Sequence, residues 1–123
     1  MSHTCHAPGC TRLVAPPMLM CPPHWFALPQ KIRNAIWREY RLGQELDKDP
    51  SLRYRAVQRL ACAYSVFRPD DEKAVLLAFG FIAAAMRYAK ECIEAGLGDP
   101  IDGLIPKDWP EPMKKMRARA KYL

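Results

Sequence analysis

The sequence predicts a mainly α-helical fold, in which an irregular N-terminal loop packs on a bundle of about three helices and an extended segment with a basic tail follows. Most of the 12 prolines lie in residues 8–29 and 100–112, which marks those segments as irregular. Between them, apolar side chains recur at helical spacing. A chain of 123 residues has a common length for one domain with one core. We expect one compact domain with three parts, namely residues 1–27, 28–98 and 99–123.

Cysteines and histidines cluster near the N-terminus, where three of the five cysteines and all three histidines lie within residues 3–24. Four of them have the spacing Cys5-x4-Cys10-x10-Cys21-x2-His24. Structural zinc sites take four tetrahedral thiolate and imidazole ligands, as two close pairs separated by a loop. The sequence therefore predicts that residues 1–27 form a zinc loop, with a knuckle that binds one structural Zn²⁺.

The residues between the ligands suit this role. Pro8 and Gly9 supply a turn inside the first pair, and Pro22 and Pro23 stiffen the second pair before a helix begins. So short and proline-rich a segment cannot build its own core. Metal binding, worth on the order of 10 kcal/mol, would supply its folding free energy.

Other readings of these residues remain open. His6 can replace one of the cysteines as a ligand, and His3 is a weaker substitute. A disulfide or unrelated free thiols are the alternatives to a metal, although the histidine at the fourth position favours the metal.

An enzyme is the function class that the sequence disfavours most. A catalytic zinc keeps one coordination position open, whereas a fourth protein ligand closes this site. A histidine-rich metal nuclease would need further histidines, and the sequence has none after His24.

The first helix is predicted over residues 28–42. Pro29 stands near its first position, Gly43 follows as a C-cap, and an apolar stripe recurs at helical spacing. The stripe consists of Leu28, Ile32, Ala35, Ile36 and Tyr40.

Trp37 falls on the other side of this helix, between Arg33 and Arg41. An exposed aromatic ring flanked by guanidinium groups can stack on a nucleobase or anchor a protein partner. The alternative is that Trp37 packs under the zinc loop, against Trp25.

A second helix is predicted to begin at residues 49–51 and to end at Phe67, before Pro69. Apolar side chains cover about half of its circumference. Arg55 and Arg59 point the other way, one turn apart, and form a basic edge. Such an edge is either a solvated face or a phosphate-binding site.

A third helix is predicted from Asp70 or Asp71 to Ala95, with an acidic cap at its start and glycines after its end. Its middle is apolar all round, so we expect it to be the central helix of the bundle. Gly80 and Ala84 would allow another helix to approach closely.

The last 25 residues divide into two segments. In the first, prolines alternate with Ile101, Leu104, Ile105 and Trp109, which suggests an extended strap laid over the helices. After Pro112 a basic tail follows, of a kind that commonly contacts nucleic acid or an acidic protein surface. Its candidate contact residues are Lys114, Lys115, Arg117 and Arg119.

Membrane insertion and secretion are not expected. The longest apolar run, residues 74–86, is shorter than the roughly 18–20 residues that a membrane helix needs. The N-terminus has no features of a signal peptide. Cys62 and Cys92 fall in helical stretches without an obvious pairing partner and are expected to be inert core residues, so we predict a cytoplasmic location.

Residues 5–44 resemble short zinc-motif proteins encoded by phages and prophages. The N-terminal spacing is also similar to small treble-clef-like modules of phage nucleic-acid-handling proteins. The resemblance implies a zinc ligand set, a bacterial host cell and an accessory role, and it implies no reaction. Leu42 departs from the pattern, in which proline precedes Gly43. The motif residues are Met20-Cys21-Pro22-Pro23-His24-Trp25, Leu28-Pro29, Ile32-Arg33, Ala35-Ile36-Trp37, Tyr40-Arg41 and Gly43-Gln44.

Two functions are therefore predicted from different classes. The first is nucleic-acid binding, non-specific or of modest specificity, since the net charge is +6 and no reading helix is recognisable. The second is a protein-binding inhibitor of a host enzyme or defence complex, of anti-restriction or anti-CRISPR type. A structural or assembly role, in which the tail docks on an acidic neighbour, is a third possibility.

Overall fold

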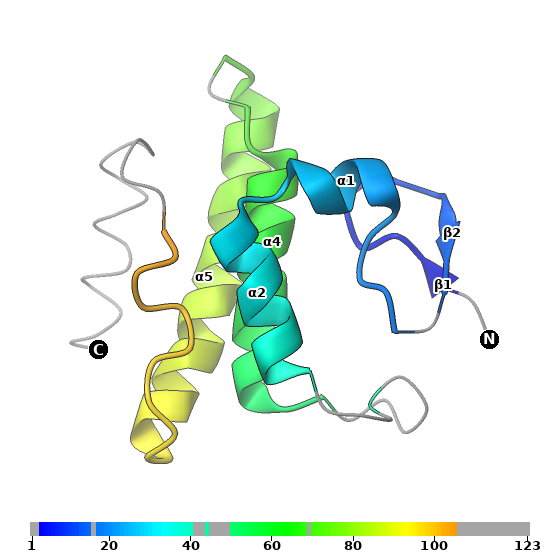
Figure 1. Cartoon of the computed structure of the whole chain (residues 1–123). Coiled ribbons are helices and arrows are strands. Elements are labelled where there is room, and N and C mark those ends of the chain that lie inside the picture. The colour runs from blue at the N-terminus through cyan, green and yellow to red at the C-terminus, as the bar shows by residue number, and fades with distance from the viewer. Residues whose placement is uncertain (1–2, 16, 41–43, 45–49, 69, 106–123) are drawn as a thin grey trace.

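The computed structural model describes residues 3–15, 17–40, 44, 50–68 and 70–105. The protein is mainly α-helical, as predicted, with a small N-terminal hairpin beside the helices (Figure 1). The elements in chain order are β1 (His3–Thr4), β2 (Leu13–Val14), α1 (Pro22–Ala27), α2 (Gln30–Glu39), α4 (Leu52–Val66) and α5 (Glu72–Glu94). The two strands are antiparallel, with His3 opposite Val14 and Thr4 opposite Leu13.

Several predictions of the sequence fall outside the described residues. They concern Arg41, Trp109 and the basic tail with Lys114, Lys115, Arg117 and Arg119.

The first predicted helix is wrong in its boundaries, because the structure breaks the segment at Leu28 and Pro29. Leu28 is extended, with φ −71° and ψ 144°, and ends α1. A residue that precedes proline is sterically disfavoured from the helical region, so the chain turns there before α2 begins. Pro22 and Pro23 likewise form the first turn of α1, where proline is well tolerated, rather than a stiff segment ahead of it.

Side-chain caps define the starts of α4 and α5 close to the predicted positions. The Ser51 hydroxyl accepts a hydrogen bond from the backbone N–H of Tyr54, at 3.1 Å. The Asp71 carboxylate accepts two, from the N–H groups of Lys73 at 3.0 Å and Ala74 at 3.3 Å. Each cap satisfies N–H groups that have no partner within the helix.

The end of α5 is a Schellman motif. The N–H of Leu97 bonds the Cys92 carbonyl at 2.8 Å, and the N–H of Gly96 bonds the Ile93 carbonyl at 3.1 Å. Gly96 has φ +77°, a conformation that glycine adopts without steric cost. The predicted glycine stop is therefore confirmed.

The central helix is α4, and not α5 as the sequence suggested. Helix α4 packs against both α2 and α5. Its Ala56, Val57, Leu60, Ala61 and Ala63 are fully buried. Small side chains on more than one face of α4 let both neighbouring helices approach.

Helix α5 buries only one face among the described residues. The buried stripe recurs at helical spacing and comprises Ala74, Ala78, Ile82, Ala85, Met86, Ala89 and Cys92. On the other side, Leu76 and Leu77 are 62% and 48% exposed. Gly80 is exposed, and a Cβ built there meets no atom within 4 Å, so it does not mark a close helix contact in the described structure. An apolar composition therefore does not by itself identify the central helix.

The described part of the strap, residues 99–105, runs back along the bundle antiparallel to α2 (Figure 1). Arg38 donates to the Pro100 carbonyl at 3.0 Å, and Lys31, two turns earlier, donates to the Gly103 carbonyl at 3.2 Å. Ile101 and Leu104 are buried. The strap is thus laid over the helices as predicted, but residues 101–104 form turns rather than an extended chain.

An ion pair connects the end of α2 to the start of α4. Arg53 Nε lies 2.7 Å from Glu39 Oε1, and Arg38 Nε lies 3.0 Å from Glu39 Oε2. Burial is the largest influence on the Glu39 pKa and raises it, but the hydrogen bonds and charges of the two arginines together outweigh burial. The pKa of Glu39 is therefore lowered, and its charged form stabilises the fold.

We expect Glu39→Gln to lower the free energy of unfolding by about 1–2 kcal/mol at neutral pH. Because the folded pKa lies below the unfolded value, the contribution is present above the unfolded pKa. It is lost as pH falls through the folded pKa, so the difference between wild type and variant should vanish in acid. Urea unfolding across this pH range measures the effect.

Glu94→Gln is the matched control, since the Lys90–Glu94 pair is longer, at 3.9 Å, and exposed. It should change stability little at any pH. Equal losses in both variants would show that the Glu39 pair has no special role.

Candidate metal centre

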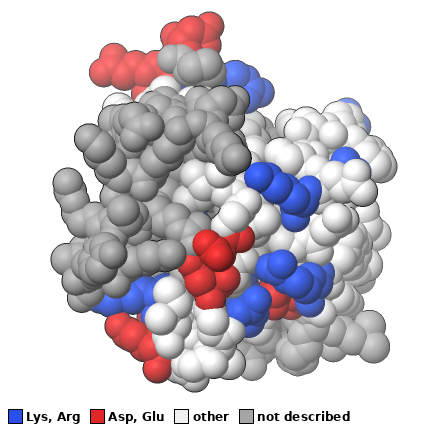
Figure 2. All heavy atoms as spheres, turned by 60° about the vertical axis from the view of Figure 1, so that its left-hand side comes forward, with Lys and Arg blue, Asp and Glu red and all other residues white. Residues whose placement is uncertain are grey.

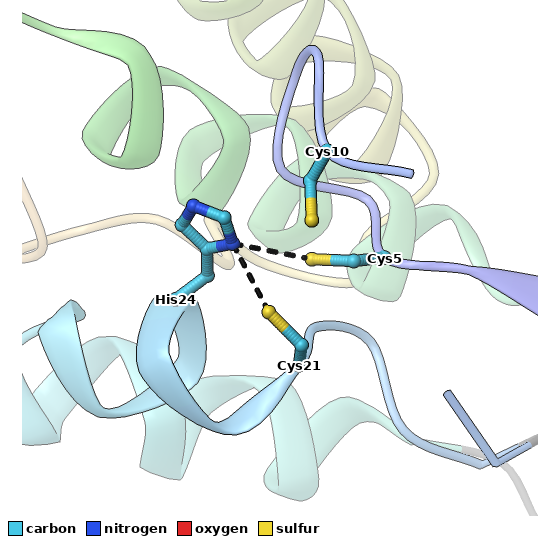
Figure 3. A group of neighbouring side chains, drawn as sticks. All are labelled: Cys5, Cys10, Cys21 and His24. Carbon is cyan, nitrogen blue, oxygen red and sulfur yellow. Dashed lines mark hydrogen bonds between the residues drawn. The ribbon is translucent and has the colours of Figure 1, made fainter. Parts of the chain in front are cut away.

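Four side chains converge between the hairpin and α1. The sulfur atoms of Cys5, Cys10 and Cys21 and a ring nitrogen of His24 all lie within 4.8 Å of one another (Figure 3). His24 Nδ1 is 3.1 Å from Cys21 Sγ and 3.6 Å from Cys5 Sγ. Zinc donors in a tetrahedral site are about 3.5–3.8 Å apart, given Zn–S and Zn–N distances of about 2.3 and 2.0 Å. The four residues can hold a metal ion with little rearrangement.

The first pair of ligands lies in the loop between β1 and β2. The N–H of Cys5 bonds the Arg12 carbonyl at 2.8 Å, and the N–H of Cys10 bonds the Ala7 carbonyl at 3.0 Å. The second bond closes a turn whose middle residues are Pro8 and Gly9, and Gly9 has φ +84°. This pattern is typical of a type II turn, so the predicted Pro8-Gly9 turn is confirmed.

The second pair comes from the start of α1. Cys21 is the N-cap residue, and His24 lies in the first helical turn, so both side chains face the hairpin (Figure 3). The backbone N–H of His24 is the largest influence on the Cys21 thiol and lowers its pKa to about 7. Burial raises the pKa of the Cys5 thiol. A metal ion would be needed to hold Cys5 as a thiolate at neutral pH.

His6 ties the N-terminal loop between β1 and β2 to α4 and is not one of the four grouped side chains. Its carbonyl accepts a hydrogen bond from the Cys62 thiol, at 3.4 Å, and its Nδ1 lies 3.3 Å from Nε2 of Gln58. The group of four ligand atoms includes neither His6 nor His3. The structure therefore gives His6 a different role from the substitute ligand that the sequence allowed.

All five cysteines are free, so the disulfide alternative is not realised. Cys62 and Cys92 are buried in α4 and α5, as predicted. Burial raises the pKa of the Cys62 thiol to about 11, which keeps it protonated and unreactive.

A pocket of about 350 Å³ lies beside the metal centre, between the N-terminal segment and α4. The sequence did not predict it, because its walls come from separate segments that only the fold brings together. Its described lining residues are His3, His6, Pro17, Met18, Leu19, Tyr40, Gln44, Pro50, Tyr54 and Gln58.

Trp37 combines both alternatives that the sequence left open. Its ring contacts Trp25, with the centroids 6.1 Å apart, and yet the residue is 45% exposed. It also contacts Tyr40 at 5.4 Å, and Tyr40 contacts Tyr54 at 6.4 Å. A row of rings therefore runs from α1, next to the metal centre, to the wall of the pocket.

The described arginines of the predicted binding surface lie on two helices, with Arg33 on α2 and Arg55 and Arg59 on α4. Arg33 donates to the Leu28 carbonyl at 3.2 Å, and its guanidinium lies 5.4 Å from the ring centre of Phe26. Arg55 and Arg59 are half-buried on α4. Arg59 lies near enough to His6 for its charge to lower the pKa of His6, together with the larger effects of burial and of His3.

In the view of Figure 2 the basic side chains of the described residues do not gather on one face. Basic side chains are separated there and lie next to acidic ones. Several basic side chains also serve the fold, since Lys31, Arg38 and Arg53 bond carbonyl oxygens between residues 97 and 103.

Comparisons of the chain with family models, with curated proteins and with solved structures find no match. No helix in the described part of the chain is long and apolar enough to cross a membrane. The function is therefore inferred from the metal centre and the surfaces around it.

Proposed function

We propose that the protein is a small zinc-binding accessory protein that binds nucleic acid with little or modest sequence specificity. The observation that carries the metal assignment is the approach of four donor atoms to within 4.8 Å. Zinc fits best because three thiolates and one imidazole are the ligands of structural zinc sites, and soft thiolates disfavour magnesium and calcium.

The role of the zinc is structural. If Cys5, Cys10, Cys21 and His24 all bind the ion, they would fill its tetrahedral shell and leave no position for a substrate or a reactive water. The ion would join the hairpin to the first turn of α1, and thereby hold the hairpin and α1 against α2 and α4. The resemblance of residues 5–44 to phage-encoded zinc-motif proteins supports a role in a bacterial host cell.

Nucleic-acid binding is supported by the basic and aromatic residues around the zinc loop. Arg59 lies beside His6, and Arg55 is one turn away on the same helix. Trp37 presents an exposed ring that can stack on a base. Such contacts require no reading helix, which agrees with binding of low sequence specificity.

The test is fluorescence anisotropy of labelled single- and double-stranded DNA and RNA with the zinc-loaded protein, at low and physiological salt. We expect the double variant Arg55→Gln/Arg59→Gln to weaken binding by about tenfold and to reduce the salt dependence. The matched control Lys73→Gln/Arg87→Gln removes the same charge from exposed positions on α5 and should change affinity much less. If no nucleic acid binds near physiological salt, the proposal fails.

A protein-binding inhibitor of a host enzyme or defence complex is the second candidate. Adjacent exposed apolar side chains on α5, Leu76 and Leu77, favour it, because such groups often mark protein interfaces. This candidate predicts that the protein binds one protein partner tightly. The double variant Leu76→Lys/Leu77→Lys should abolish binding of that partner and leave nucleic-acid affinity unchanged.

A further inference from the structure

We propose that the pocket between the zinc loop and α4 receives one unpaired nucleobase of a single strand. The inference rests on the proposed nucleic-acid function and specifies which part of the nucleic acid the protein holds. The volume of the pocket, about 350 Å³, is near the lower end of the range of about 300–1,000 Å³ that is typical of small-molecule sites.

Four aromatic rings are among the described residues of the pocket wall. Tyr40 and Tyr54 come from the end of α2 and the start of α4, and His3 and His6 come from the N-terminal segment. Tyrosine and histidine rings are common stacking surfaces for splayed-out bases. Tyr54 is only 6% exposed, so the rings available for stacking on a purine or pyrimidine are those of His3, His6 and Tyr40.

Two amide side chains complete the wall. Gln44 is buried, whereas Gln58 is half-buried and carries a hydrogen-bond donor and an acceptor, which is the combination that base edges require. The Gln58 amide already lies 3.3 Å from His6 Nδ1, so it is held at the pocket wall by a ring that also lines the pocket.

Cationic residues lie where the strand would leave the pocket. Tyr54 and Gln58, four residues apart on α4, both line the pocket. Arg55 and Arg59 directly follow Tyr54 and Gln58, so each lies about 100° further round the helix than a lining residue, and Arg59 is near His6, which also lines the pocket. They are placed to contact the phosphates that flank an inserted base.

A second stacking surface adjoins the pocket. The exposed ring of Trp37 is 5.4 Å from that of Tyr40, which lines the pocket. A neighbouring base of the same strand can stack on Trp37 while the first occupies the pocket. Single-strand binders combine such aromatic platforms with a basic track.

The decisive comparison uses the wild-type protein with two single strands of equal length and charge, one with bases and one wholly abasic. We expect the abasic strand to bind at least about tenfold more weakly, since base stacking contributes strongly to single-strand affinity. Equal affinities would overturn the base-binding inference while leaving nucleic-acid binding intact. If neither strand binds, the base-binding inference fails, and the proposed function fails with it only if double-stranded DNA and RNA do not bind either.

A substitution in the pocket wall tests whether the base binds there. Tyr40→Leu should abolish most of the difference between the two strands, whereas the control Tyr88→Leu, a half-buried tyrosine on α5, should preserve it. The melting temperature and metal content of each variant establish that it is folded.

A proline-rich peptide is the competing occupant of an aromatic-lined groove. If labelled decaproline binds and Tyr40→Leu abolishes that binding, while the abasic and base-bearing strands behave alike, the pocket is a peptide site and the inference is wrong.

Discussion

Cys21→Ser is expected to abolish metal binding and to unfold the zinc loop. Cys21 is buried at the junction of the loop and α1, and its sulfur lies 3.1 Å from the His24 ligand nitrogen. Metal binding of on the order of 10 kcal/mol would be lost, and the segment would then depend on the packing of buried side chains such as Met20 and Trp25 alone. Removal of the metal from the wild type with a chelator should have the same effect.

Hydrogen exchange and metal content measure this result. Amide protection in residues 3–27 should be lost, whereas α4 and α5 should keep most of theirs, since they pack extensively on each other. Cys92→Ala, a change at a buried cysteine of α5, is the control and should leave one metal ion bound. If the serine variant binds metal as tightly as the wild type, the ligand assignment is wrong.

Leu60→Ala should cause the largest loss of stability by a single core substitution in α4. Leu60 is 0% exposed and lies in the middle of the helix that contacts both α2 and α5. Removing its buried methyl groups leaves a cavity that neighbours on two sides cannot fill, at a cost of about 2–5 kcal/mol. Urea unfolding, followed by the loss of helical circular dichroism, measures the difference.

Leu76→Ala is the matched control. It makes the same change at an exposed position of α5 and should cost less than about 0.5 kcal/mol. Similar losses at Leu60 and Leu76 would contradict the assignment of α4 as the central helix and would indicate that a further surface covers Leu76.

The starts of α4 and α5, the end of α5 and the grouping of Cys5, Cys10, Cys21 and His24 were predictable because local chemistry determines them. Ser51 and Asp71 cap helices with side chains that reach N–H groups two or three residues away. Gly96 stops α5 through bonds to the preceding turn. The ligands come as two pairs, each held by a turn, so their spacing was informative even without the fold.

The break at Leu28 was missed although its cause is also local. The apolar stripe continues through Leu28 into α2, and periodicity alone joined the two helices. The steric restriction on a residue before Pro29 was the signal that would have placed the boundary correctly.

By itself the sequence determined the mainly helical fold, the caps of α4 and α5, and a group of four cysteine and histidine side chains at the spacing of a metal site. Only the tertiary structure decided that α4 is central, that Trp37 contacts Trp25 and remains partly exposed, and that His3, His6, Tyr40, Tyr54 and Gln58 share a pocket. Caps and turns depend on neighbours within about one helical turn, which a sequence displays directly. The central helix and the pocket depend on which surfaces far apart in the chain come to face one another, and that choice is made by the packing of the whole core.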